Sequence, residues 1–435
     1  MFSTWLRIFA ITSIGSLTSD SVDWEPIEGP PLVFAHDLVS EELREGERFK
    51  LAPIAYVVNF GYEFDLDSDF GDFHVRGIKM LELTVHEIDA LEKLEEITKT
   101  KAFATSFSEA LKNPIVRSWA VARRPVTTVT RIPSGIVRYL QGKFFEVKRG
   151  SEKLAAKTKE HRYRGESNEK DPVGEKVTGA AKKVGSTTKK LSRRHLGFDK
   201  AKRDWSRRLK VDPYTTNGYL QFELERIAWA STVGSFAGEF AIPSSSVLSY
   251  TLQAQEMVWS KSEKELERLN SKSLKTMGVD TSVLVQFDQL DQYTLTEKTE
   301  LVITLEEIEV DGRLDLIQLM LEVETREEAM LMVKIISAIG NYHQLVKPIE
   351  EVAIRRGLAV CYDEEGTMVL PLALDYLHWS KEISEVLLSN DLYDESRCLW
   401  ISGTASAIAK RRLATHEWKL KENCFDTFTA LQPNP

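Results

Sequence analysis

The fold class is decided by residues 56–97, which read YVVNFGYEFDLDSDFGDFHVRGIKMLELTVHEIDALEKLEEI. Apolar and polar residues alternate over residues 56–66, which is the period of a half-buried strand. A second apolar run, residues 73–85, follows an acidic turn, so the two runs predict a β-hairpin. From His86 the apolar residues recur three or four apart, and this period predicts a helix. Residues 21–112 are therefore predicted to form a small α+β domain.

The chain as a whole is predicted to be a multidomain α+β protein that is mainly helical. Its 435 residues exceed what one ordinary hydrophobic core holds, and 42% of them are hydrophobic, which excludes a wholly disordered protein. We expect an N-terminal α+β domain, a basic and partly disordered or amphipathic middle, a helical domain and a small C-terminal α/β domain. The predicted boundaries are 1–20 for a signal peptide, 21–112, 113–210, 211–345 and 346–435.

Local signals support the helices of this scheme. Capping-box patterns begin helices at Thr294 and Thr325, with Glu297 and Glu328 three residues later, and Ser106 with Glu109 suggests another. Residues 198–209 predict an amphipathic helix. The core of the helical domain is predicted from apolar residues at helical spacing, namely Leu220, Leu224, Ile227, Val333 and Ile336.

The last 90 residues predict strands and a helix in turn. Residues 358–362 and 368–374 flank an acidic turn that ends in Gly366, which is a hairpin signal. Residues 398–401 read as a strand, 406–415 as a basic helix and 418–420 as a further strand.

Positive charge is concentrated in one part of an acidic chain. Residues 113–210 hold 27 Lys and Arg against 9 Asp and Glu, although the whole chain has a net charge of −9. Such a stretch is suited to contact an anionic surface, or to fold onto the acidic parts of its own chain.

Within this stretch, apolar residues recur with an eleven-residue period, which keeps them on one face of a long helix. The positions are Val173, Val177, Ala180, Val184, Thr188 and Leu191. With the Lys- and Thr-rich residues 157–160, this pattern resembles the lipid-binding repeats of the synucleins and some apolipoproteins, which implies a helix formed on anionic lipid. The residues predicted to contact an anionic surface are Lys176, Lys182, Lys183, Lys189, Lys190, Arg193, Arg194, Lys200, Lys202 and Arg203.

Other interpretations of the basic and apolar stretches stay open. Residues 150–192 could equally be a flexible linker, and nucleic acid is disfavoured because Tyr163 is the single aromatic between residues 146 and 197. The apolar helix 227–241 is favoured as a core helix over a membrane span, since Glu239 and Pro243 oppose spanning.

The N-terminus predicts export. A mostly apolar run over residues 8–17 follows Arg7, and the polar Ser19-Asp20-Ser21 comes after it. The phrases Leu196–Lys202 (LGFDKAK) and Val211–Asn217 (VDPYTTN), with Ile401-Ser-Gly near the end, resemble an uncharacterised family of bacterial exported proteins. The resemblance implies a shared architecture over most of the chain and implies no activity. The location that the N-terminal run predicts is the periplasm, the outer envelope or the outside of the cell.

No catalytic signature is visible. His86-Glu87 and His378 could each serve as a base, but spacing identifies no partner for either. The acidic turn from Asp65 to Asp72 fails the pattern of a calcium loop, and a solvated turn is favoured. The junction at residues 402–404 lacks a Gly-rich phosphate loop. Cys361, Cys398 and Cys424 are scattered singly, which argues against a zinc site or a disulfide scaffold.

The function predicted from the sequence is that of an exported, non-enzymatic protein without cofactor or metal. It attaches peripherally to an anionic membrane or envelope polymer through residues 113–210. One alternative is a hydrolase-type enzyme with a site between the helical and C-terminal domains. Another is an adaptor whose basic segment docks on an acidic protein partner.

Overall fold

The computed structural model describes residues 27–122, 135–141, 197–233 and 250–425. Over these ranges the protein is a mixed α/β structure, with sixteen α-helices and twelve short strands, so the coarse prediction of a mainly helical α and β protein is confirmed.

The N-terminal strands form one antiparallel sheet in the order β1-β3-β4-β2, and β5 pairs with the other side of β4. Two short helices, α1 and α2, link β1 to β2. The bounds are β1 (Leu32–Phe34), α1 (Ala35–Leu38), α2 (Glu41–Arg44), β2 (Phe49–Leu51), β3 (Ile54–Val58), β4 (Gly61–Ser68) and β5 (Phe73–Arg76).

The single strand predicted over residues 56–66 is wrong, because a tight turn divides it. Asn59 and Phe60 both have positive φ, 48° and 66°, and Val58 pairs with Gly61. This is the geometry of a two-residue hairpin, which needs left-handed backbone at both turn positions. The second predicted strand also ends early, at Arg76, because α3 (Ile78–Thr98) begins eight residues before the predicted start at His86.

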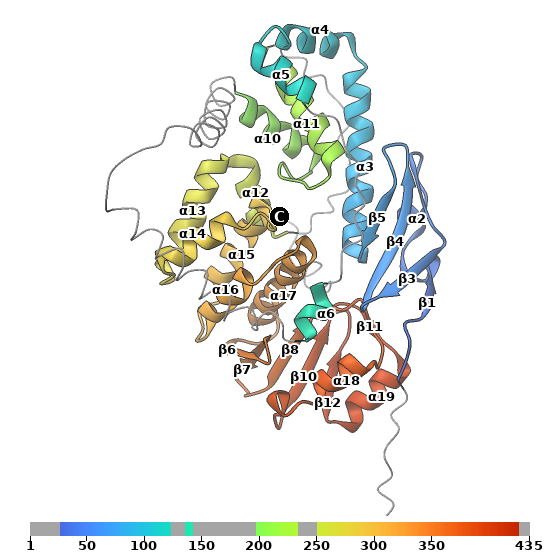
Figure 1. The fold of residues 1–435 in the computed structure, drawn as a ribbon, viewed down its shortest axis with the longest axis vertical. Helices are drawn as coiled ribbons and strands as arrows, with labels where there is room; N and C mark the ends of the chain where they lie inside the picture. Colours follow the sequence, from blue (N-terminus) through green and yellow to red (C-terminus); the bar gives the residue numbers. More distant parts are fainter. Residues whose placement is uncertain (1–26, 123–134, 142–196, 234–249, 426–435) are drawn as a thin grey trace, which may run out of the picture.

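Of the helices that follow, α3 packs along the N-terminal sheet, and α4, α10 and α11 add buried residues to the same core. These three helices and α5 extend beyond the sheet (Figure 1). The bounds are α4 (Lys101–Ala110), α5 (Pro114–Ala122), α10 (Phe198–Leu209) and α11 (Gly218–Ser231). The helix predicted over residues 198–209 is confirmed as α10. The predicted capping box at Ser106 is wrong, since Thr100 caps α4 by accepting from Phe103 N and Ser106 lies inside the helix.

The remaining helices form a bundle, and both predicted capping boxes are present at its helices α15 and α17. The five predicted core residues are all buried. Leu220, Leu224 and Ile227, however, pack with the N-terminal sheet, whereas Val333 and Ile336 belong to a second core shared with the C-terminal sheet. The bounds are α12 (Leu252–Ser260), α13 (Glu263–Thr276), α14 (Thr281–Gln289), α15 (Leu295–Glu307), α16 (Arg313–Leu321) and α17 (Arg326–Leu345).

The C-terminal sheet has the order β12-β10-β8-β7-β6, with β8, β10 and β12 mutually parallel and β6 and β7 antiparallel. The predicted hairpin, strands and helix are confirmed. A two-stranded sheet of β9 and β11 lies beyond β8 and β10. The bounds are β6 (Ile349–Arg355), β7 (Leu358–Asp363), β8 (Met368–Leu372), β9 (Tyr376–Leu377), α18 (Lys381–Leu387), β10 (Arg397–Ile401), β11 (Thr404–Ala405), α19 (Ala407–Thr415) and β12 (Trp418–Lys421).

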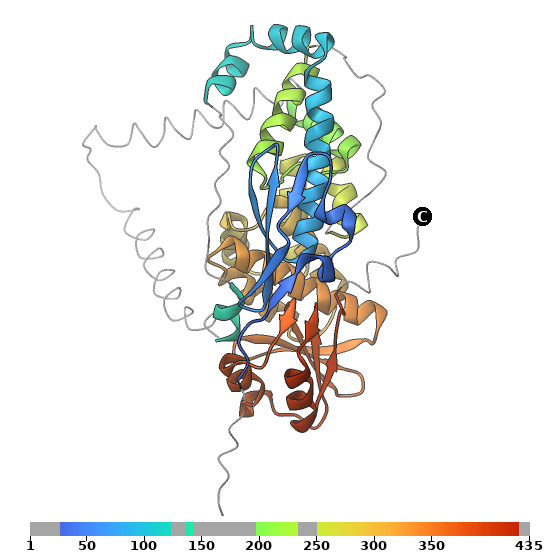
Figure 2. The ribbon, with the colours of Figure 1, turned by 90° about the vertical axis from the view of Figure 1, so that its right-hand side faces the viewer.

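Figure 1 shows an elongated molecule in which α3 runs along the N-terminal strands. The C-terminal sheet lies at one end, and α4, α5, α10 and α11 lie at the other. Figure 2 shows the same order from the side. The three cysteines are buried and free. Among the described helices, none combines the length and the hydropathy that a membrane crossing needs.

Candidate functional site

A cavity of about 910 Å³ lies where the N-terminal sheet, the helical bundle and the C-terminal sheet meet. Its walls are the first turn of α3, one face each of α15 and α17, and the loops that follow β8 and β10. In Figure 1 the lower end of α3 lies near α17, and β11 lies below them. Ligands of α/β proteins bind at the carboxyl ends of parallel strands, and this cavity has that position relative to β8 and β10.

Asp375, three residues after β8, joins the two sheets at the cavity wall. Its carboxylate Oδ2 accepts a hydrogen bond from the backbone N of Tyr62 at 3.0 Å. In the other direction, the backbone N of Asp375 and that of Tyr376 both donate to the carbonyl oxygen of Phe60, at 2.9 and 3.0 Å. The Phe60 ring is buried in the C-terminal core and stacks on His378 with centroids 4.7 Å apart. The tip of the N-terminal hairpin is thus held inside the C-terminal region.

The turn at residues 402–404 closes the cavity beside Asp375. Gly403 N donates to Leu374 O at 2.8 Å and Thr404 N donates to Asp375 O at 3.1 Å. A Cβ on Gly403 would lie 1.9 Å from the Asp375 carbonyl oxygen, so a glycine is required here. Because these N–H groups already have protein acceptors, the turn does not offer them to an anion. Burial raises the pKa of Tyr62, whose hydroxyl is hydrogen-bonded to Thr404.

Lys334 places a positive charge in the same corner. Its Nζ and the Oδ2 atom of Asp375 each lie 3.4 Å from the point that a Cβ on Gly77 would occupy. Gly77 is the N-cap of α3 and has a φ of 85°, which glycine adopts without strain. The lysine, the aspartate and the start of α3 therefore share one polar corner of the cavity.

The opposite wall is acidic. Glu297, Glu300 and Glu307 are three, then seven residues apart along α15, and all three line the cavity with Thr304 between them. Glu300 is 2% exposed, and its Oε2 accepts from Thr251 N at 3.0 Å and from Thr251 Oγ1 at 2.7 Å. Burial raises the pKa of Glu300 despite these two hydrogen bonds. Glu297 forms a two-pronged ion pair with Arg326.

A second cavity, of about 330 Å³, adjoins the first through Met80, Leu83 and Tyr250, which line both. It contains two buried carboxylates, Glu87 and Asp212. Burial raises the pKa of Glu87 to about 7 and that of Asp212 to about 6.

Both carboxylates involve the phrase VDPYTTN (Val211–Asn217): Glu87 accepts hydrogen bonds from it, and Asp212 is one of its residues. Glu87 Oε1 accepts from Thr215 Oγ1 at 2.5 Å and Glu87 Oε2 accepts from Asn217 Nδ2 at 3.0 Å. Asp212 Oδ1 accepts from Thr296 Oγ1 at 2.7 Å. Asn217 also caps α11, because its side chain accepts from the backbone N of Tyr219 and of Leu220. The phrase therefore connects α3, α11 and α15 through buried hydrogen bonds.

The histidines considered as bases have structural surroundings. His86 Nε2 lies 3.0 Å from the carbonyl oxygen of Lys210, and burial lowers the pKa of His378, which stacks on Phe60. Across the described ranges, no group of three or more His, Cys, Asp or Glu residues is placed to hold a metal ion, and this includes the turn from Asp65 to Asp72.

The residues predicted to contact an anionic surface are only partly described. Lys200 is exposed on α10, Arg203 is half-buried, and Lys202 Nζ lies 3.9 Å from the buried carboxylate of Glu225. The other members lie outside the described residues, namely Lys176, Lys182, Lys183, Lys189, Lys190, Arg193 and Arg194.

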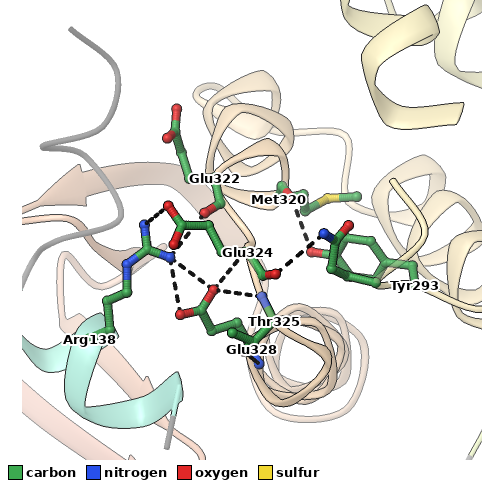
Figure 3. Close-up of polar contacts among 8 residues, drawn as sticks. Arg138, Tyr293, Met320, Glu322, Glu324, Thr325 and Glu328 are labelled. Carbon is green, nitrogen blue, oxygen red and sulfur yellow. Dashed lines mark hydrogen bonds and ion pairs between the residues drawn. The ribbon is translucent and has the colours of Figure 1, made fainter. Parts of the chain in front are cut away.

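Another residue of the basic stretch, Arg138, contacts acidic groups of its own chain (Figure 3). It lies on the short helix α6 (Gly135–Leu140), and its NH1 donates to both oxygens of Glu328, at 2.9 and 3.1 Å. Its NH2 donates to Glu324 at 3.0 Å. Beside it, Tyr139 is fully buried and accepts from Ala359 N at 2.9 Å. These described parts of the basic stretch fold onto the acidic body, the second possibility that the charge pattern left open.

Sequence reasoning missed the first cavity because its walls come from parts of the chain that are far apart in the sequence. One signal was available: the phrase Ile401-Ser-Gly stood out in the sequence, and its residues Ser402 and Gly403 line the site. Comparison with known proteins finds no matching family model, no similar curated protein and no similar solved structure. The resemblance to bacterial exported proteins therefore stays a prediction.

Proposed function

We propose that the protein binds a small molecule in the cavity between α3, α15, α17 and the loops after β8 and β10. The observation that carries this proposal is the cavity itself. Its volume of about 910 Å³ is in the range of small-molecule sites, and charged, polar and apolar side chains all line it.

The construction of the walls supports the proposal. The Gly403 turn, the Asp375 carboxylate and the Phe60 hairpin tip fix the position of the two sheets by hydrogen bonds on main-chain atoms. A site whose walls are held in place requires little reorganisation when the ligand binds, which favours affinity. The location also matches the alternative predicted from the sequence, an enzyme with a site between the helical and C-terminal regions. Binding is the activity we propose, and any reaction would follow from it.

A cavity-filling variant tests the proposal. Ser337 is half-buried on α17 and lines the cavity, so Ser337→Trp should occupy part of the volume. Ser282→Trp, on the exposed surface of α14 away from the cavity, is the matched control. A fragment library is screened by ligand-observed NMR against both variants and the original chain. Fragments that bind the original and the control but not Ser337→Trp support the proposal. Equal binding to all three places the ligands elsewhere and contradicts it.

Peripheral attachment to an anionic membrane or envelope polymer is a second proposal. It is favoured by the excess of Lys and Arg over residues 113–210 and by Lys200 and Arg208, which are exposed on α10. Attachment dominated by such charges is weakened by salt. Export from the cytoplasm stays part of this second proposal.

A further inference from the structure

We infer that the ligand of the cavity carries a cationic nitrogen, an amine or a guanidinium, which the acidic face of α15 binds through Glu300. The inference rests on the proposed function and deepens it, because it names the chemical class of the ligand.

The walls of the cavity carry more negative than positive groups. Six carboxylates line the cavity, on Asp37, Glu82, Glu297, Glu300, Glu307 and Asp375, against two ammonium groups, on Lys79 and Lys334. A concave surface with an excess of one charge sign concentrates ligands of the opposite sign.

Several of these carboxylates already have a cation beside them. Glu82 pairs with Lys79 at 3.3 Å, and Glu297 pairs with Arg326. Asp375 accepts from Tyr62 N, and Lys334 Nζ lies in the same corner. Asp37 Oδ1 lies 3.2 Å from Nε2 of the exposed His36. Glu300 and Glu307 differ from these four carboxylates, because neither forms an ion pair with any residue of the described ranges. Glu307 has one neutral donor, Gln344 Nε2 at 2.6 Å.

Glu300 is the more deeply buried of the two cavity carboxylates that have no cation among the described residues. At 2% exposure this side chain has little access to bulk water, and Thr251 supplies both of its hydrogen bonds to a single oxygen, Oε2. Oε1 receives no hydrogen bond within the part of the chain that the structure describes, and the residue lines the cavity. Buried carboxylates in proteins are normally paired with a cation or fully hydrogen-bonded. A protonated nitrogen in the cavity would supply the missing partner.

An anionic ligand fits this wall poorly. Its charge would meet Glu300 and Glu307 at close range without an intervening cation from α15, and like charges in a partly desolvated site repel strongly. The burial that raises the pKa of Glu300 is the same unfavourable desolvation that an incoming cation would offset.

The test uses probes that share one apolar part and differ in charge: benzylamine and benzamidine as cations, benzyl alcohol as the neutral compound and benzoate as the anion. Binding to the full chain is measured by ligand-observed NMR and by calorimetry. We expect the two cations to bind more tightly than benzyl alcohol, and benzoate to bind weakest.

The variant Glu300→Gln keeps an oxygen for Thr251 but removes the charge, and it should weaken cation binding by about 30-fold or more. Glu306→Gln is the matched control, because Glu306 is exposed on α15 and its carboxylate contacts Ser273 outside the cavity. If Glu300→Gln does not fold, Glu307→Gln replaces it, since Glu307 is exposed and also lines the cavity.

The outcomes separate the two proposals. Preferential cation binding that is lost in Glu300→Gln and kept in Glu306→Gln supports the inference. Neutral or anionic probes that bind as well as the cations, and are blocked by Ser337→Trp, overturn the inference and leave the proposed function standing. If no probe or library fragment binds at its solubility limit, both are overturned.

Discussion

Replacing Glu87 by glutamine should change how the stability of the protein depends on pH. Burial raises the pKa of this carboxyl from 4.5 to about 7, so the folded protein holds the proton more tightly than the unfolded chain does. The stabilisation by the neutral carboxyl is therefore fully present below pH 4.5 and is lost as the pH rises through 7. At 1.4 kcal/mol per pKa unit, the loss between pH 5 and pH 8 is about 2.5 kcal/mol.

The hydrogen bonds of the site allow this substitution. In Glu87→Gln the amide oxygen can accept from Asn217 Nδ2, and the amide nitrogen can donate to the hydroxyl of Thr215, which accepts as well as donates. The variant should therefore fold, lack the pH-dependent loss of this group, and be more stable than the original chain at pH 8.

Urea unfolding followed by tryptophan fluorescence, at pH 5, 6, 7 and 8, measures the effect. Glu96→Gln is the control, because Glu96 lies on the same helix with its side chain 57% exposed. This control should follow the pH profile of the original chain. Parallel profiles for Glu87→Gln and the original chain would refute the reasoning, since they would mean that Glu87 titrates equally in the folded and unfolded states.

Three further predictions concern the basic stretch, the cavity wall and attachment to anionic vesicles. Arg138→Met should destabilise the fold by about 3–5 kcal/mol in the same urea assay, because it leaves the Glu328 carboxylate, 3% exposed, without its cation. The control Arg411→Met, on the exposed face of α19, should leave the free energy of unfolding nearly unchanged. Gly403→Ala should lower the melting temperature and abolish fragment binding, because the new methyl group would overlap the Asp375 carbonyl. The control Gly29→Ala should do neither, because no atom lies within 4 Å of its new methyl group. The full chain should sediment with anionic vesicles at low salt and be released at high salt. A variant with Gln in place of Lys182, Lys183, Lys189 and Lys190 should not sediment. Equal binding to neutral vesicles would contradict an electrostatic attachment.

Local signals predicted much of the fold. The capping boxes at Thr294 and Thr325, the helix at residues 198–209 and the β7–β8 hairpin depend on neighbouring residues alone, so the sequence could show them. The N-terminal hairpin could not be found in this way. Its turn is Asn-Phe, and without the glycine that usually follows asparagine in such turns the alternation seemed to continue as one strand.

The two-residue turn also explains why the alternation over residues 56–66 predicts the wrong side of the sheet for some side chains. Val57 pairs with Tyr62, so both point to the core, although they are an odd number of residues apart. A continuous alternation places one of them outside. Tyr56, expected inside with Tyr62, is accordingly 47% exposed.

The candidate site was harder to predict from the sequence than the fold. Asp375, Glu300 and Gly77 meet only after the sheets and the bundle have packed, and no periodicity in the chain links them. A site between the helical and C-terminal regions was one alternative interpretation of the sequence, and the sequence could not indicate the groups that would form it.

The attachment of Phe60 to the loop after β8 has a consequence for how the protein is made. The backbone N–H groups that donate to the carbonyl of Phe60 belong to Asp375 and Tyr376, more than 300 residues further along the chain. A ribosome that adds about 5–20 residues per second needs roughly 15–60 s to reach them. During that interval the aromatic tip of the finished hairpin has no core to enter. Nascent chains arrested before Asp375 should therefore present Phe60 to chaperones that bind exposed apolar groups, and chains extended past His378 should not.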